Sequence, residues 1–186
     1  MKRILLALTA MLTALAAHSQ DEASMKAWMD YATPGSMQKM IAMADGEWKA
    51  DMTFWMAPGA PPMTTTGSCT NKMIMGGRYQ ESRYTSTMDG QPFEGTGILG
   101  YDNVRKVFIT TWIDNMGTGV MYLEGKLDDA TRTITFTGTA TDAIAGKAMP
   151  VRQVVKWVDD NNQVMEMYSM ANGTEFKSME LKFTRK

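Results

Sequence analysis

From Glu47 onward, apolar and polar side chains alternate along the chain, and this two-residue period indicates strands with one buried face. Trp48, Met52 and Phe54 share the apolar face of the first such segment. Turn signals rich in Gly, Pro, Asn and Asp then recur at short intervals, as in "APGAPP", "MDGQP" and "ANGTE". We therefore predict ten strands: 47–56, 63–75, 78–88, 92–101, 106–115, 119–127, 132–141, 149–159, 163–170 and 175–185.

The connections between these strands are too short for parallel crossovers, so neighbouring strands should pair as antiparallel hairpins. Ten meandering strands form either two packed sheets or a closed barrel, and closure removes the exposed edges. We predict the second arrangement: an all-β, lipocalin-like, up-and-down antiparallel barrel over residues 46–186.

The residues before the first strand follow a helical period instead. Met25, Trp28 and Met29 form one apolar stripe, and Pro34-Gly35 interrupts it. Ser36 can cap a second short helix. We expect residues 20–45 to form one or two short helices that cover one end of the barrel.

A pair of residues at the two ends of the barrel sequence predicts how it closes. Arg185 lies in line with Met179, Leu181 and Phe183 on the apolar face of the last strand, where a charge needs a partner. If the first and last strands meet, Trp48 can supply its indole for a cation–π contact with Arg185. Lipocalin-type barrels pair their Gly-x-Trp with a late arginine in this way.

Several segments resemble one bacterial family. "GRYQES", "PFEGTGILGYDNVRKVFITTWIDNMGTG" and "SMELKFTRK", together with "FWMAPGAPP", are similar to DUF1579, a domain of unknown function. The resemblance covers Pro34 to Lys186 and implies a lipocalin-like barrel, with no established activity, substrate or catalytic residue. Members tend to carry a histidine in the helix before Gly-x-Trp, where this chain has Gln38, and Asp-Pro where it has Asp142-Ala143.

The first 19 residues have the pattern of a secretory signal peptide. Lys2 and Arg3 precede the apolar run "ILLALTAMLTALAA", and Ala17 and Ser19 fit the small-x-small cleavage rule. We expect cleavage after about Ser19, no membrane anchor in the mature chain, and a periplasmic or secreted protein. A retained membrane anchor is the alternative.

Cleavage would change the available chemistry. It removes the only histidine, His18, and lowers the basic residues from 19 to 17 against 20 acidic ones, a net charge of −3. Without a basic patch we expect no nucleic-acid partner. The single cysteine, Cys69, cannot form an internal disulfide, and its place in an alternating run favours a buried, inert thiol over a reactive one.

Methionine is in large excess, with 20 residues in the whole chain. Most fall at strand or helix positions that face a core, and methionine suits an irregular cavity because it is flexible. Thioethers also bind Cu(I), so a methionine-based copper site is an alternative; otherwise we expect no cofactor and no metal.

A ten-stranded barrel is wide enough to enclose a cavity. We therefore expect this protein to bind a small apolar or amphipathic molecule in its interior. Alternation along the strands predicts these lining residues: Met52, Phe54, Tyr84, Trp112, Tyr122 and Tyr168, with Arg78, Asp114 and Arg152 as polar anchors.

The alternative is a cofactor-free enzyme, an isomerase, cyclase or hydrolase, that uses Asp, Glu, Tyr and Arg at the barrel mouth. No Gly-x-Ser-x-Gly elbow, phosphate-binding glycine loop or HExxH motif is present to specify a reaction. The sequence does not specify the oligomeric state.

Overall fold

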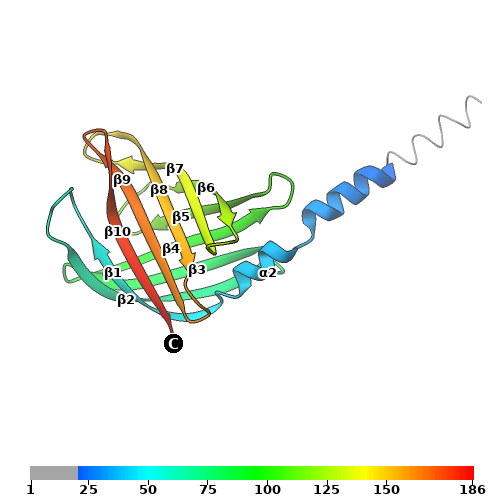
Figure 1. Cartoon of the computed structure of the whole chain (residues 1–186), viewed down its shortest axis with the longest axis horizontal. Helices are drawn as coiled ribbons and strands as arrows, with labels where there is room; N and C mark the ends of the chain where they lie inside the picture. Colours follow the sequence, from blue (N-terminus) through cyan, green and yellow to red (C-terminus); the bar gives the residue numbers. More distant parts are fainter. Residues whose placement is uncertain (1–20) are drawn as a thin grey trace, which may run out of the picture. The chain divides into compact units, whose positions relative to one another are not determined.

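Ten strands form one closed antiparallel barrel in the computed structural model, which describes residues 21–186 (Figure 1). Each strand pairs with the next along the chain, and β10 returns to pair with β1. The strands are β1 (Gly46–Phe54), β2 (Met63–Ile74), β3 (Tyr79–Met88), β4 (Gln91–Asp102), β5 (Val107–Asp114), β6 (Met121–Asp128), β7 (Thr133–Asp142), β8 (Lys147–Trp157), β9 (Asn162–Ala171) and β10 (Thr174–Arg185). The predicted barrel and its strand number are confirmed, and every strand begins and ends within two residues of its prediction.

Helical structure precedes the barrel in two pieces. Residues 21–32 are helical and belong to a unit that ends at Thr33, and the side chains of Met25 and Trp28 in it are exposed. The second piece, α2 (Ser36–Ala42), belongs to the same compact unit as the barrel. The predicted signal peptide lies outside the described residues.

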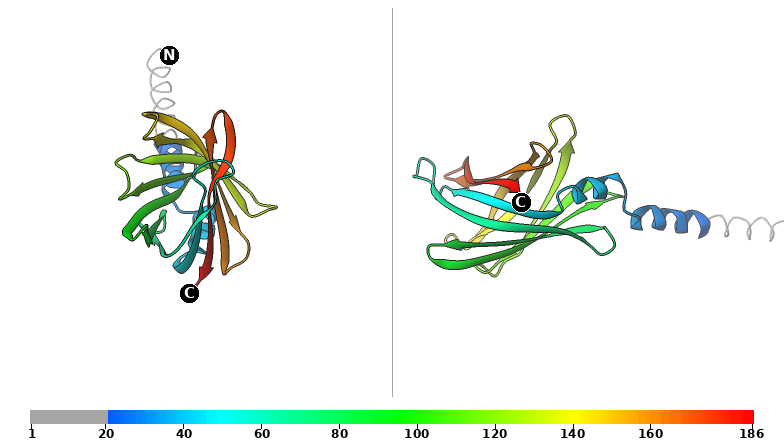
Figure 2. Two further views of the ribbon diagram at one scale, coloured as in Figure 1. Left: turned by 90° about the vertical axis from the view of Figure 1, so that its left-hand side faces the viewer. Right: turned by 90° about the horizontal axis from the view of Figure 1, so that it is seen from below.

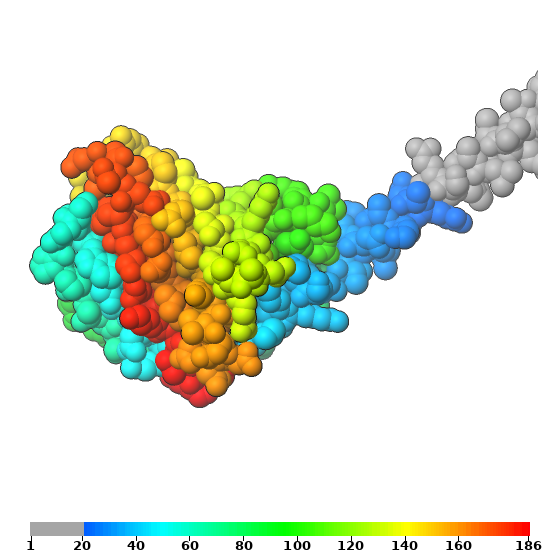
Figure 3. All heavy atoms as spheres, viewed as in Figure 1, coloured from blue at the N-terminus to red at the C-terminus, as the bar shows by residue number. Residues whose placement is uncertain are grey.

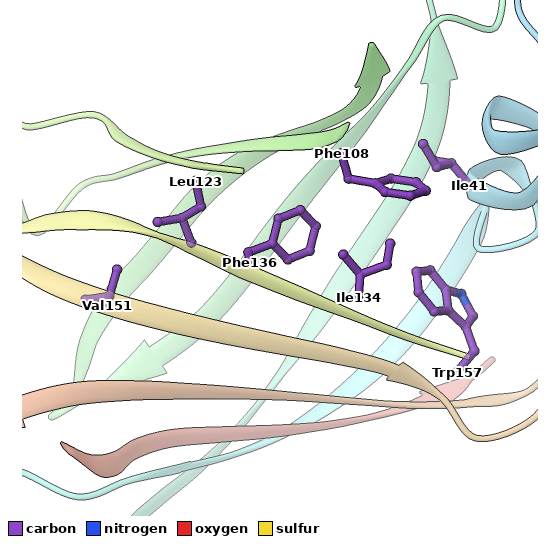
Figure 4. Close-up of a cluster of buried hydrophobic side chains, with 7 residues drawn as sticks. All are labelled: Ile41, Phe108, Leu123, Ile134, Phe136, Val151 and Trp157. Carbon is purple, nitrogen blue, oxygen red and sulfur yellow. The ribbon is translucent and has the colours of Figure 1, made fainter. Parts of the chain in front are cut away.

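Helix α2 closes one end of the barrel, opposite the β1–β2 loop (Figure 2). Ile41 is fully buried and packs into a cluster with Phe108, Ile134 and Trp157 from three strands (Figure 4). Because successive strands are antiparallel, residues 75–78, 103–106, 129–132 and 158–161 turn at this closed end. Residues 55–62, 89–90, 115–120, 143–146 and 172–173 turn at the other end.

The contact that closes the barrel joins its first and last strands. Trp48 and Arg185 are directly opposite in the β1–β10 register, and the guanidinium carbon lies 4.2 Å from the indole centroid. Arg185 also donates hydrogen bonds to the carbonyl oxygens of Met43 (2.7 Å), Asp45 (2.6 Å) and Asp160 (3.1 Å). One side chain therefore ties β10 to the end of α2 and to the β8–β9 turn.

Gly46 is required at this point because its φ is +118°, a backbone conformation that side chains disfavour. A Cβ there would also come within 3.2 Å of Arg185 Nη1. The Gly-x-Trp segment thus starts β1 and leaves room for the arginine.

A second core cluster lies next to this closure. It includes Trp48, Cys69, Leu181 and Phe183, and Cys69 is only 1% exposed. The expectation that Cys69 is buried is confirmed. Burial raises the pKa of the Cys69 thiol from 9.0 to about 12, opposed by a hydrogen bond with Tyr84.

Replacing Arg185 with lysine should destabilise the barrel, because an ammonium group cannot reproduce the planar fork that bonds three carbonyls and covers an indole. We expect Arg185→Lys to lower the free energy of unfolding by about 2 kcal/mol in urea denaturation. Arg83→Lys is the matched control, because Arg83 is largely exposed and its ion pair with Glu81 lies at the surface. Its effect should stay below about 0.5 kcal/mol. Equal losses in the two variants would contradict a special role for Arg185.

The buried thiol should make stability depend on alkaline pH. Above pH 9 the unfolded chain loses the Cys69 proton, whereas the folded protein keeps it to about pH 12. The unfolded state then binds fewer protons, so the free energy of unfolding falls as pH rises from 9 towards 12, by up to about 1.4 kcal/mol per pH unit. Urea midpoints across this interval should fall less steeply in Cys69→Ala than in the wild type, and parallel curves would show that the thiol is not the cause.

Candidate functional site

The barrel encloses a cavity of about 430 Å³ that is lined mainly by apolar side chains. It opens at the end away from α2, because its lining includes Phe54, Phe93 and Asp114 together with Met116 of the exposed 115–120 loop. Small-molecule sites in proteins usually have volumes of about 300 to 1,000 Å³. The cavity is therefore large enough for a small organic molecule.

One side of the mouth is formed by Trp112, whose indole lies directly over Gly95 of the neighbouring strand. A Cβ at Gly95 would overlap the ring carbons of Trp112. Tyr84 meets the same ring edge-on, with centroids 5.0 Å apart, and Phe93 stacks beside it at 6.5 Å. The glycine and the two aromatic rings together fix the position of the indole.

The carboxylate of Asp114 is also held at the mouth. Its Oδ2 accepts a hydrogen bond of 2.6 Å from Trp112 Nε1, and its Oδ1 accepts one of 2.9 Å from the backbone N–H of Met116. Asp114 is the only carboxylate that lines the cavity within residues 21–186. The mouth therefore carries one negative charge, oriented by two donors.

Polar side chains at the closed end fasten α2 to the barrel. Gln80 donates to the Ile41 carbonyl (2.9 Å) and to Asp45 Oδ1 (2.7 Å), while Asp45 Oδ2 accepts from the N–H of Met73 (3.0 Å). Asn71 Nδ2 donates to the carbonyl of Ala44 at 3.0 Å. Gln80 and Asn71 line the cavity, but they already have partners.

Gln38 has a structural role at the start of α2. It is 5% exposed, its Nε2 donates to the carbonyl oxygen of Tyr101 (3.0 Å), and its Oε1 accepts from the N–H of Gly35 (2.8 Å). These bonds join the start of α2 to the end of β4.

Several other polar side chains line the cavity and make no hydrogen bond with the part of the chain that the structure describes. They are Ser82 of β3, Thr110 and Thr111 of β5, Gln153 and Trp157 of β8, and Gln163 of β9. Gln163 is 8% exposed. An unbonded buried amide costs free energy, so these groups are available to another molecule.

The interior wall is uncharged. None of the lining side chains contributed by residues 21–186 is Lys, Arg or His. Burial raises the pKa of Tyr84 well above its ordinary value, assisted by the nearby Cys69, so its hydroxyl stays neutral at physiological pH. The single charge of the cavity is therefore Asp114, at the mouth.

Five of the nine residues predicted to line or anchor a ligand site come together around this cavity: Met52, Phe54, Tyr84, Trp112 and Asp114. They lie on the inner faces of β1, β3 and β5. Whether they bind a ligand stays a prediction.

Arg152 and Tyr168 do not line the cavity, contrary to prediction. They lie on the outer face of β8 and β9, where the Arg152 guanidinium stacks 3.8 Å from the Tyr168 ring centroid and bonds Glu175 at 2.6 Å. Figure 3 shows this outer wall, with β9 and β10 side by side in orange and red. The prediction chose the wrong phase: Gln153 and Trp157 point inward on β8, so Arg152 points outward.

Arg78 and Tyr122 also lie outside the cavity. Arg78 is exposed in the 75–78 turn at the closed end, and its Nη1 donates to the carbonyl of Met75 at 3.2 Å. Tyr122 is exposed on the outer face of β6 and donates to Glu124 at 2.6 Å. Leu123 is the fully buried neighbour, so Tyr122 has the opposite orientation.

Sequence reasoning overlooked the inner face of β9, which carries Gln163, Met165 and Met167. The signal was present, because these residues alternate with Glu166 and Tyr168, which bond each other on the outer face at 2.8 Å. Choosing the methionines rather than the tyrosine as the buried set would have identified this wall.

The methionine excess has a clear location. Seven methionines line the cavity: Met52, Met88, Met116, Met121, Met165, Met167 and Met179. They come from several strands, which agrees with a flexible apolar lining. Within residues 21–186, no group of three or more His, Cys, Asp or Glu side chains is arranged to hold a metal ion.

Across residues 21–186, no helix combines the length and apolar character needed to span a membrane.

Comparison with a solved structure supports the fold. The crystal structure of Rv2717c from M. tuberculosis is similar, with a TM-score of 0.61 and 14% identity, over 83% of this chain and 99% of that one. A redesigned β barrel, b11L5F_LGL, aligns with a TM-score of 0.43 and 12% identity, over 82% of this chain and 99% of that one. No curated protein matches the sequence.

The family model described as "Protein of unknown function (DUF1579)" matches residues 33–185, from three residues before α2 to the arginine that closes the barrel. This match spans most of the chain and all ten strands. The chain therefore belongs to the DUF1579 family.

Proposed function

We propose that this protein is exported and binds a small, largely apolar molecule inside its barrel. The supporting observation is the cavity of about 430 Å³, closed by α2 at one end and open at the other. Apolar side chains surround the body of the cavity, and few polar groups interrupt them, which is the usual composition of a small-molecule site. The signal-peptide pattern of residues 1–19 supports export.

The geometry gives less support to acid–base catalysis at the mouth. Two carboxylates in different environments could divide acid and base roles, but within residues 21–186 Asp114 alone lines the cavity. The two arginines predicted as polar anchors, Arg78 and Arg152, do not line the cavity. Binding is therefore the function that these residues favour.

Native mass spectrometry of the protein purified from its own host tests this proposal. We expect a reproducible added mass that organic extraction removes, because an apolar molecule in a mostly closed cavity should survive purification. A bare mass, together with no uptake of the neutral fluorescent probe N-phenyl-1-naphthylamine by the purified protein, would overturn the proposal. An addition of the mass of copper that survives extraction would favour the methionine–copper alternative instead.

The position of Trp112 should control access to the cavity. In Gly95→Ala the new methyl group must displace the indole, so we expect the affinity for N-phenyl-1-naphthylamine to fall by about tenfold. Fluorescence titration measures this change, and the emission of Trp112 should shift as well.

Gly117→Ala is the matched control for Gly95→Ala. Gly117 lies in the exposed 115–120 loop, and a Cβ there would have no neighbouring atom within 4 Å. The Gly117→Ala protein should therefore bind the probe with the same affinity as the wild type. Equal affinities in all three proteins would show that the probe does not enter at Trp112.

A further inference from the structure

The chemistry of the cavity's inner end points to one class of ligand, and this inference rests on the proposed binding function. Two adjacent residues carry it: Trp157, the last residue of β8, and Gln163, its Cα partner on β9. Both line the cavity, and they are 7% and 8% exposed.

Both residues carry polar groups without partners. The Trp157 indole N–H is buried and has no hydrogen-bond partner among residues 21–186. The Gln163 amide, with two N–H donors and one carbonyl acceptor, lines the cavity and makes no hydrogen bond with residues 21–186. The fully buried side-chain N and O atoms without a partner in that part of the chain are Trp157 Nε1 and Ser86 Oγ. Gln163 differs from them because its amide faces the cavity, where a ligand can reach it.

Charge distribution restricts what could bond these groups. A buried carboxylate or phosphate needs a cation or several donors to offset its lost hydration. The lining residues of the described chain include no Lys, Arg or His, and the only acidic residue among them is Asp114 at the mouth. Asp45, a second carboxylate, bonds the lining residue Gln80 at the closed end. An anionic group would therefore be disfavoured at both ends of the cavity.

An uncharged polar group can enter the cavity without the desolvation cost of a charge. An alcohol, ketone or amide oxygen can accept from the Gln163 amide, and a hydroxyl or amide N–H can donate to the Gln163 carbonyl. The methionines Met165 and Met167, further along the same inner face of β9, would then contact an apolar chain.

We infer that Gln163 binds an uncharged hydrogen-bonding group at the inner end of the cavity. The ligand class is accordingly a neutral amphiphile, such as a long-chain alcohol or primary amide, rather than a fatty carboxylate.

Displacement of N-phenyl-1-naphthylamine from the wild-type protein tests the ligand class. Dodecanol and dodecanamide should compete at least about tenfold better than dodecanoate at neutral pH, because only the carboxylate enters charged. Dodecanoate that competes as well as dodecanol would overturn the inference while leaving the binding function intact. A wild-type protein that takes up neither the probe nor any of these compounds would instead refute the proposed function.

Two variants test the residue. Gln163→Leu should lower the affinity of the protein for dodecanol and for dodecanamide about tenfold. Its affinity for the probe should change by no more than about twofold, because binding of the probe needs no hydrogen bond from the Gln163 amide. Gln91→Leu is the matched control, because Gln91 is exposed at the start of β4 and does not line the cavity; it should leave the affinities for the alcohol and the amide unchanged. Equal losses of alcohol affinity in the two variants would show that the effect does not come from the Gln163 amide.

Thermal unfolding supplies a readout that does not depend on binding. Because Gln163 has no partner in the unliganded barrel, Gln163→Leu should keep or raise the Tm of the ligand-free protein. A clearly lowered Tm would mean that the amide has a structural partner, and it would overturn the inference.

Discussion

The structure depends on the contact between Trp48 and Arg185, because it joins the two strands that are furthest apart in the sequence. Antiparallel hairpins form locally, whereas pairing β1 with β10 brings together residues at the two ends of the barrel sequence. The guanidinium covers the indole and also bonds the carbonyls that end α2. The same side chain, Arg185, therefore joins β10 to β1 and holds α2 over the end of the barrel.

The contacts that stabilise the barrel are unevenly distributed around the cavity. The buried clusters and the polar bonds of Gln38, Gln80 and Asn71 are concentrated at the α2 end or along one wall. The opposite end has exposed loops and the aromatic mouth around Trp112. Because the barrel is held together at the α2 end, its other end can stay open. The contacts at the α2 end also offset the free-energy cost of leaving amide side chains in the cavity without hydrogen bonds.

The outer wall explains why charged residues within strands need not indicate a site. On the outer face, Arg152 of β8 stacks on Tyr168 of β9 and bonds Glu175 of β10, so the cluster spans three neighbouring strands. The Arg152 hydrogen bonds lower the pKa of Glu175, as expected for a surface ion pair. Such clusters have the residue types of an active site, but they lie on the face away from the cavity.

Alternation, turn residues and one arginine on an apolar strand face are local signals, so the amino-acid sequence was enough to predict the barrel, its ten strands, its closing pair and the burial of Cys69. It also placed Trp112 and Asp114 at the cavity. The orientation of Arg152, Tyr122 and Tyr168 became clear only from the tertiary structure. Both faces of their strands mix apolar and polar residues, so alternation shows that neighbouring side chains point to opposite faces but not which face points into the barrel. The unpartnered state of Gln163 also required the folded barrel, because a missing hydrogen bond depends on neighbours distant in sequence.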